Sequence, residues 1–185
     1  MRLDEIAEDL GGEVEIQWKS YLLRPEPEDR TIEKFTEYTQ SWKRPGSMEP
    51  RITFNPWSGN SPPPSHSIPA ALAGKVAGLF GAEAYQSFHH RAMEAYFTDN
   101  RTISDVAVLV DIAAEAGIDR AEFDERWQAR SKDLINDVID DHNAAVNAGI
   151  SGVPAVVVGD KYLVGGAVDT DEYRQIIAKV RSETR

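Results

Sequence analysis

Apolar positions along the chain predict helices at both ends and through the middle. They recur at helical spacing over residues 2–10 and again over 169–182, so a helix is expected at each end. The same spacing returns in successive stretches of 68–149, which predicts a block of helices without a strand. The most regular of these helices follows Ser104, the expected N-cap, and ends at Gly117.

Two stretches have the pattern of strands. Residues 13–23 begin with alternating polar and apolar side chains, which is typical of a strand with one buried face. Residues 155–158 are an apolar, mostly β-branched run, and the Gly-Asp pair at 159–160 can turn the chain into a return strand at 162–164. We therefore expect 13–23 and the hairpin at 154–165 to share one sheet.

Two further segments lie between the first strand and the helical block. Residues 31–42 have a helical pattern that the Pro-Gly pair at 45–46 should stop, and 52–69 are too rich in proline for regular structure. Two aromatic side chains in this proline-rich loop, Phe54 and Trp57, are costly to leave in water. They either anchor the loop in a core or line a substrate groove.

The charge and composition of the chain argue against several classes of function. The chain has 185 residues, with 31 acids against 20 bases and a formal net charge of −11, so it is not expected to bind nucleic acid. No apolar run is long enough for a membrane span, and the first ten residues are acidic and amphipathic, unlike a signal peptide. We expect a soluble cytoplasmic protein without a membrane partner. Cysteine is absent, which excludes disulfides and thiolate nucleophiles in this chain.

The histidines and aspartates give little sign of a catalytic centre. None of the histidines has a metal-type spacing, so neither a metal nor a cofactor is expected. His89 and His142 are expected at helix interfaces, whereas His66, in the proline-rich loop, is the better candidate for binding. A short helix is predicted at 122–129 and a longer one at 132–147. Three aspartates near the end of the longer helix are expected to form a solvated acidic face: Asp137, Asp140 and Asp141.

One short motif is more specific. Ser151, Gly152, Val153 and Pro154 directly precede the apolar strand at 155–158. Proline is tolerated as the first residue of a strand, so the motif can be purely structural. The alternative is a cis Val153–Pro154 bond in a binding loop, which local sequence alone would not justify.

Longer motifs carry a resemblance to a known family. Residues 152–167, GVPAVVVGDKYLVGGA, resemble the C-terminal half of DsbA-family thioredoxin-fold oxidoreductases, especially the FrnE-like branch. Residues 88–97 (FHHRAMEAYF), 100–105 (NRTISD) and 113–119 (AAEAGID) are similar to the inserted helical domain of that branch. Residues 14–25 resemble its second thioredoxin strand and the loop that follows.

The resemblance implies an α/β fold: a thioredoxin-like mixed sheet with an inserted all-helical domain, lacking its first central strand. Residues 1–30 and 149–185 would form the incomplete thioredoxin-like domain, and 31–148 the insertion, a loop followed by the helical domain. In the family, the first strand leads to a C-x-x-C motif, and this chain has neither. Because a central strand pairs on both sides, either the natural protein begins upstream or another strand fills the gap.

The family's binding loop does carry over. The resemblance assigns substrate binding to Gly152, Val153 and Pro154, with Trp57 and His66 as further groove residues and no catalytic residue. The implied partner is a peptide or protein thiol or disulfide, or a small thiol such as glutathione, and the chain could form a homo-oligomer.

Three functions stay open on this basis. The first is a disulfide oxidoreductase whose C-x-x-C lies upstream, so that this chain is itself redox-silent. The second is a non-catalytic peptide-binding or chaperone-like protein of the same fold. The third is a relative of kappa-class glutathione transferases and hydroxychromene carboxylate isomerases.

Overall fold

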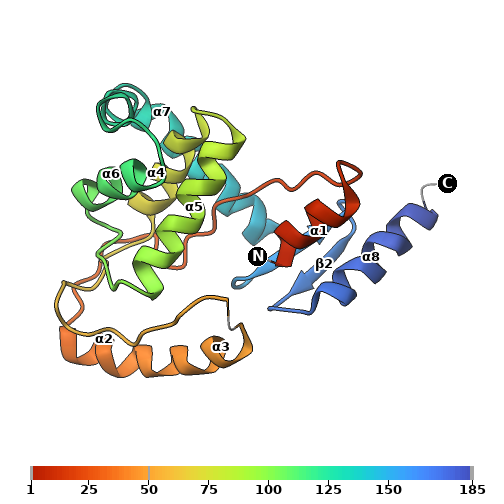
Figure 1. Cartoon of the computed structure of the whole chain (residues 1–185), viewed down its shortest axis with the longest axis horizontal. Coiled ribbons are helices and arrows are strands. Elements are labelled where there is room, and N and C mark those ends of the chain that lie inside the picture. The colour runs from red at the N-terminus through yellow and green to blue at the C-terminus, as the bar shows by residue number, and fades with distance from the viewer. Residues whose placement is uncertain (1, 50, 184–185) are drawn as a thin grey trace. The chain divides into compact units, whose positions relative to one another are not determined.

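The structure, a computed structural model, describes residues 2–49 and 51–183 and is mostly helical (Figure 1). Its elements in chain order are α1 (Arg2–Leu10), α2 (Ile32–Thr39), the 3-10 helix η1 (Gln40–Trp42), α3 (Lys43–Met48), α4 (Ile68–Gly78), α5 (Ala82–Phe97), α6 (Val106–Glu115), α7 (Arg120–Asn147), β1 (Ala155–Val158), β2 (Tyr162–Gly165) and α8 (Thr170–Glu183). The chain divides into two compact units, one made of residues 2–21 with 141–183 and the other of Leu22–Asp140. Within the described ranges, no helix is both long and apolar enough to cross a membrane.

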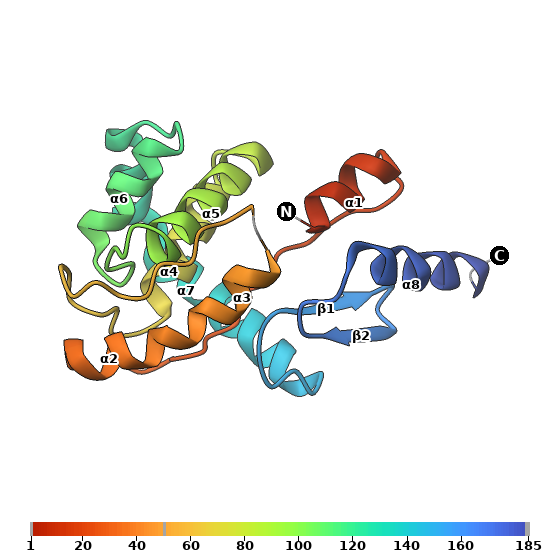
Figure 2. The same ribbon diagram turned by 60° about the horizontal axis from the view of Figure 1, so that its bottom comes forward.

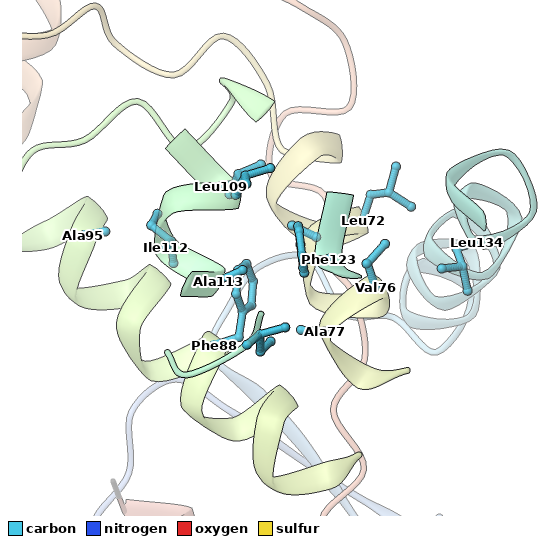
Figure 3. Close-up of a cluster of buried hydrophobic side chains, with 13 residues drawn as sticks. Leu72, Val76, Ala77, Phe88, Ala95, Leu109, Ile112, Ala113, Phe123 and Leu134 are labelled. Atoms are coloured by element: carbon cyan, nitrogen blue, oxygen red, sulfur yellow. The ribbon is translucent and has the colours of Figure 1, made fainter. Parts of the chain in front are cut away.

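The core of the Leu22–Asp140 unit lies between four helices. Side chains from α4, α5, α6 and α7 meet in one apolar cluster, which Figure 3 shows in close-up. Within it, Phe88 of α5 and Phe123 of α7 stack with ring centroids 6.1 Å apart. The predicted block of helices without a strand is confirmed across these elements.

Three local predictions in this unit are wrong, each for a simple reason. The helices expected at 122–129 and 132–147 are one helix, α7, because no glycine or proline separates them. The N-cap of α6 is Asp105, whose carboxylate accepts from the Ala107 N–H, rather than Ser104. Pro45 does not stop the helical segment, since it lies in the first turn of α3, where its missing N–H costs no hydrogen bond.

An aromatic cluster fixes the proline-rich loop to α2 and α5. Trp57 is 1% exposed and packs edge-on against Phe35, with Trp42 and Tyr96 completing the cluster. The Trp57 backbone N–H donates to Thr39 Oγ1 at 2.8 Å, and its indole N–H donates to the Ser61 carbonyl at 2.8 Å. The loop is therefore held by a core of its own.

Burial in this cluster changes the acidity of one phenol. Desolvation raises the pKa of Tyr96 to about 12, although the positive charge of Arg30 opposes the shift. Arg30 itself lies over the Phe35 ring, 4.1 Å from its centroid. Tyr96 is thus a neutral hydroxyl at physiological pH.

The other unit consists of a hairpin with two helices packed on it. β1 and β2 form an antiparallel hairpin (Figure 2). In its register Val156 lies opposite Val164 and Val157 opposite Leu163. Ile6 of α1 and Tyr173 of α8 are buried with Val164 in a small core, against which Val156 also packs. The hairpin and the helices predicted at both ends of the chain are confirmed.

The strand expected at 13–23 is not formed. Residues 13–18 are without regular structure, and the sheet of the described residues contains only β1 and β2. An alternating pattern provides side chains for one face, but a strand also needs a neighbouring backbone to pair with. No strand of the described residues 2–49 and 51–183 pairs with this segment, so the expectation that 13–23 joins the sheet is wrong.

Candidate functional site

The loop before β1 is exposed and held at both ends. At its start, Gly149 has φ +82° and its N–H donates to the Val146 carbonyl, which ends α7. At its end, the Pro154 carbonyl accepts from the Gly166 N–H at 2.8 Å, next to the β1–β2 ladder. The Val153 side chain between them is 51% exposed. The Val153–Pro154 bond is cis, the geometry that the family resemblance implies.

This loop can bind but cannot perform covalent or acid–base chemistry by itself. Gly152 has no atom within 4 Å of where a Cβ would lie, so its backbone is open to approach. Ser151 carries the loop's only side-chain donor, and none of residues 151–154 carries an acid, an imidazole or a thiol. The loop can therefore bind a ligand through backbone hydrogen bonds and through contact with the exposed isopropyl group of Val153.

The hairpin that follows has one covered face and one open face. Val156 and Val164 face the small core, whereas Val157 and Leu163, opposite each other in the ladder, are 45% and 48% exposed. An apolar pair on the outer face is typical of sheets that are covered on both sides. The sequence could not indicate this face, because a four-residue apolar run has no alternation to read.

The hairpin turn is tied to the last helix. Gly159 has φ +60°, and a Cβ there would lie 2.6 Å from Val180 Cγ1 of α8. The Tyr162 hydroxyl donates to Glu183 at 2.7 Å, and Lys161 donates to the same carboxylate. The hydrogen bond from Lys161 lowers the pKa of Glu183, which keeps this carboxylate ionised.

The two other predicted groove residues belong to the Leu22–Asp140 unit. Trp57 is buried in the aromatic cluster, which is the placement of an anchor for the loop. His66 is half-buried, with Nδ1 2.9 Å from Ser65 Oγ, and the neighbouring Ser67 N–H donates to the Arg24 carbonyl. The structure therefore does not gather Trp57 and His66 into the compact unit that contains the loop at 151–154.

Two polar residues near the end of α7 have structural contacts. Asp141 is buried, accepts from the Ser20 N–H at 3.0 Å and pairs with Lys19 at 3.2 Å, so the expected solvated role is wrong for this aspartate. His142 packs edge-on against Tyr21 with ring centroids 5.1 Å apart. Together these contacts fasten residues 19–21 to the helix that leads into the loop.

The side chains present show no arrangement for a metal ion. Across the described part of the chain, no three histidine, aspartate or glutamate residues are grouped as ligands would be. The sequence has no cysteine to add to such a group.

Solved structures with the same fold include several disulfide-exchange proteins. A Nitrosomonas europaea structure, provisionally described as a protein disulfide isomerase, superposes with a TM-score of 0.80 at 17% identity, covering 98% of this chain and 89% of that one. The cytosolic disulfide reductase DsbM of Pseudomonas aeruginosa gives 0.70 at 18% identity, covering 99% and 88%. Its structure with glutathione gives 0.71 at 16% identity, with the same coverage. At these identities the likeness concerns the fold.

Sequence comparison identifies the family. The uncharacterized protein YwbO of Bacillus subtilis is 26% identical over 172 residues, covering 91% of this chain and 83% of that protein. The family model of the DSBA-like thioredoxin domain matches residues 1–178. The expected fold class, a thioredoxin-like fold with a helical insertion and an incomplete sheet, is confirmed. The chain thus belongs to the family of DSBA-like thioredoxin domains.

Proposed function

We propose that this chain is a redox-silent member of its family that binds polypeptides carrying thiols or disulfides, with Gly152, Val153 and Pro154 as the binding loop. The observation that carries the proposal is an exposed, anchored backbone loop in a chain that has no thiol of its own. Disulfide exchange requires a thiolate that attacks a disulfide sulfur. The chain can therefore hold such a substrate without exchanging disulfides with it.

The kinds of protein that share the fold support this class of ligand. One of these structures is a disulfide reductase and another is provisionally described as a protein disulfide isomerase, so both names refer to disulfides. A full oxidoreductase activity would need a C-x-x-C motif supplied by another segment or another protein.

Calorimetry on two matched variants tests the proposal. The chain is titrated with a reduced, unfolded polypeptide whose thiols are intact, and the titration is repeated with Val153→Asp and Met93→Asp. Both positions are exposed and apolar, but Met93 lies on α5, away from the loop in sequence. Val153→Asp should weaken binding about tenfold or more, because a charge replaces an apolar contact and must be desolvated. Equal binding by all three proteins, or no binding by the unaltered chain, contradicts the proposal.

A small thiol is the second candidate ligand, because one structure of the same fold contains glutathione. Titration with glutathione distinguishes the two. Saturable glutathione binding that Val153→Asp removes, without binding of the unfolded polypeptide, would favour the small-molecule function.

A further inference from the structure

An open groove of about 660 Å³ lies between α6 and the start of α7, within the Leu22–Asp140 unit. Four of the residues that line it are small and apolar: Val106, Ala107 and Val110 of α6, and Ala121 of α7. Val110 is 7% exposed and belongs to the core of this unit, whereas both alanines are exposed. The groove therefore has an apolar floor that the side chain of a partner can cover.

Two carboxylates lie at the same groove. Asp119 Oδ1 accepts from two N–H groups at the start of α7, at 3.0 Å each, and Oδ2 takes no part in these bonds. Asp124 is exposed and forms no ion pair within residues 2–49 and 51–183. Arg120 also lines the groove, but its guanidinium donates to Asp111 of α6. The groove thus places negative charge beside an apolar floor.

The dipole of α7 explains only part of this charge. Residues 119–125 carry four acids against one base. Asp119 and Glu122 lie at the N-cap and in the first turn, where acids stabilise a helix. Asp124 and Glu125 lie beyond that turn, and both are exposed. Their charge is therefore available to a partner.

The backbone at the groove favours a partner whose own backbone is already paired. The Ala107 N–H donates to Asp105 and the Ala121 N–H to Asp119, so both helices are capped from within the chain. Deeper in the groove, the lining residues lie inside α6 and α7, where backbone groups bond along the helix. An extended segment would gain few backbone hydrogen bonds here, whereas a helix brings its own.

From this arrangement we propose that the groove binds a basic amphipathic helix of a partner protein. Its apolar side chains lie on Val106 and Val110, and its lysine or arginine side chains lie beside Asp119 and Asp124. A second copy of this chain is disfavoured as the partner, because two chains with a formal net charge of −11 repel each other. The partner differs from that of the proposed function, and the groove and the loop at 151–154 belong to different compact units.

Calorimetry on two aspartates of α7 tests the charge assignment. The probe is a blocked, alanine-rich helical peptide with two leucines one turn apart and lysines beside them. Asp124→Lys and Asp137→Lys change the net charge equally at exposed positions, but only Asp124 is among the residues that line the groove. Asp124→Lys should weaken binding about tenfold, and Asp137→Lys less than about twofold. Equal effects would mean that the peptide responds to net charge alone, which overturns the site.

A second pair of variants tests the apolar floor. Ala121→Phe fills the groove, whereas Ala129→Phe adds the same ring at an exposed position of α7 that does not line it. Circular dichroism checks that both variants fold. Ala121→Phe should weaken binding about tenfold and Ala129→Phe less than about twofold. Unchanged binding by Ala121→Phe, or an equal loss in both, overturns the placement of the leucines.

Two altered peptides test the chemistry of the partner. A central proline breaks the helix of the peptide and should weaken binding about tenfold. Glutamate in place of lysine should weaken it at least as much. Equal binding of the proline peptide overturns the helical partner, and equal binding of the glutamate peptide overturns the charge assignment. Absence of binding between the original peptide and the unaltered chain overturns the whole proposal.

Two further outcomes concern the location and the occupant. Val153→Asp should leave binding of the helical peptide unchanged, so this proposal and the proposed function can fail separately. A loss in Val153→Asp as large as that in Asp124→Lys overturns the assignment to the groove. Sedimentation that reveals a dimer lost in Ala121→Phe would place a second copy of the chain in the groove, which contradicts the choice of occupant.

Discussion

The hairpin turn requires glycine at position 159. Its φ of +60° lies in the left-handed region, and the site of a Cβ is occupied by the branched side chain of Val180. The turn can therefore pack closely on α8 only because Gly159 has no side chain. Gly165 lies in the same hairpin without either constraint, since nothing lies within 4 Å of where its Cβ would be.

We predict that Gly159→Ala lowers the free energy of unfolding by about 1–3 kcal/mol, because Val180 must move and the backbone is strained. Gly165→Ala, the control, should change it by less than about 1 kcal/mol. Urea denaturation followed by circular dichroism measures both. Equal stability of Gly159→Ala and the unaltered chain would show that α8 is not packed on the turn as described.

Thr39 is a second residue with a specific structural role. It is fully buried, accepts from the Trp57 N–H and donates to the Thr36 carbonyl. Thr39→Val keeps the shape of the side chain but leaves the Trp57 N–H buried without a partner, which should cost about 1–3 kcal/mol. Ser41→Ala, at an exposed hydroxyl nearby, is the control. Urea denaturation monitored by tryptophan fluorescence compares them, and a loss no larger than the control's would exclude this hydrogen bond.

At the scale of elements, the aromatic cluster of α2, α5 and the proline-rich loop makes the stability of the fold depend on pH. Burial raises the pKa of Tyr96 to about 12, above the value of about 10 for an unfolded tyrosine. The proton is held more tightly in the folded state, so the stabilisation is complete below pH 10 and is lost as pH rises from about 10 to 12. The loss from this group cannot exceed about 1.4 kcal/mol per pH unit.

We predict that Tyr96→Phe makes the free energy of unfolding fall less steeply between pH 9 and 11 (~2 units, spanning the unfolded pKa) than in the unaltered chain. Tyr38→Phe, which removes an exposed phenol stacked on Phe35, is the matched control. Chemical denaturation at a series of pH values gives the slopes. Identical slopes for all three proteins would mean that Tyr96 is not buried in solution.

The elements that the sequence predicted well are those that short-range rules specify. Helical spacing and Gly117 located α6 apart from its N-cap, which is Asp105 where Ser104 was predicted, and α1 and α8 follow from the same periodicity. Residues 13–18 could not be predicted this way, because pairing of a strand depends on a distant backbone. The two helices predicted at 122–129 and 132–147 are one helix, α7, because no residue between them breaks a helix.

The candidate site was predictable only in part. The motif ending in Val153 and Pro154 could be found because a proline before an apolar strand is visible in the sequence. The burial of Trp57 in an aromatic cluster, and the exposure of Val157, depend on which neighbours fold against each residue. Such neighbours cannot be read from a single sequence with short-range rules.

At the scale of the whole molecule, family membership and the absence of cysteine lead to a clear expectation. The purified chain should not accelerate reduction of insulin by dithiothreitol beyond buffer, since none of its side chains can form a mixed disulfide. Turbidity from the precipitated insulin B chain measures this rate. Turnover above buffer, with contaminating oxidoreductases excluded by mass spectrometry, would contradict redox silence.

The most direct test of the binding account is hydrogen–deuterium exchange, measured by mass spectrometry with and without a reduced, unfolded polypeptide. Peptides spanning the loop at 151–154 and β1 (Ala155–Val158) should become protected, while those from the buried helix α6 (Val106–Glu115) should stay unchanged. Protection confined to the helices of the Leu22–Asp140 unit, or no change anywhere at saturating polypeptide, would contradict it.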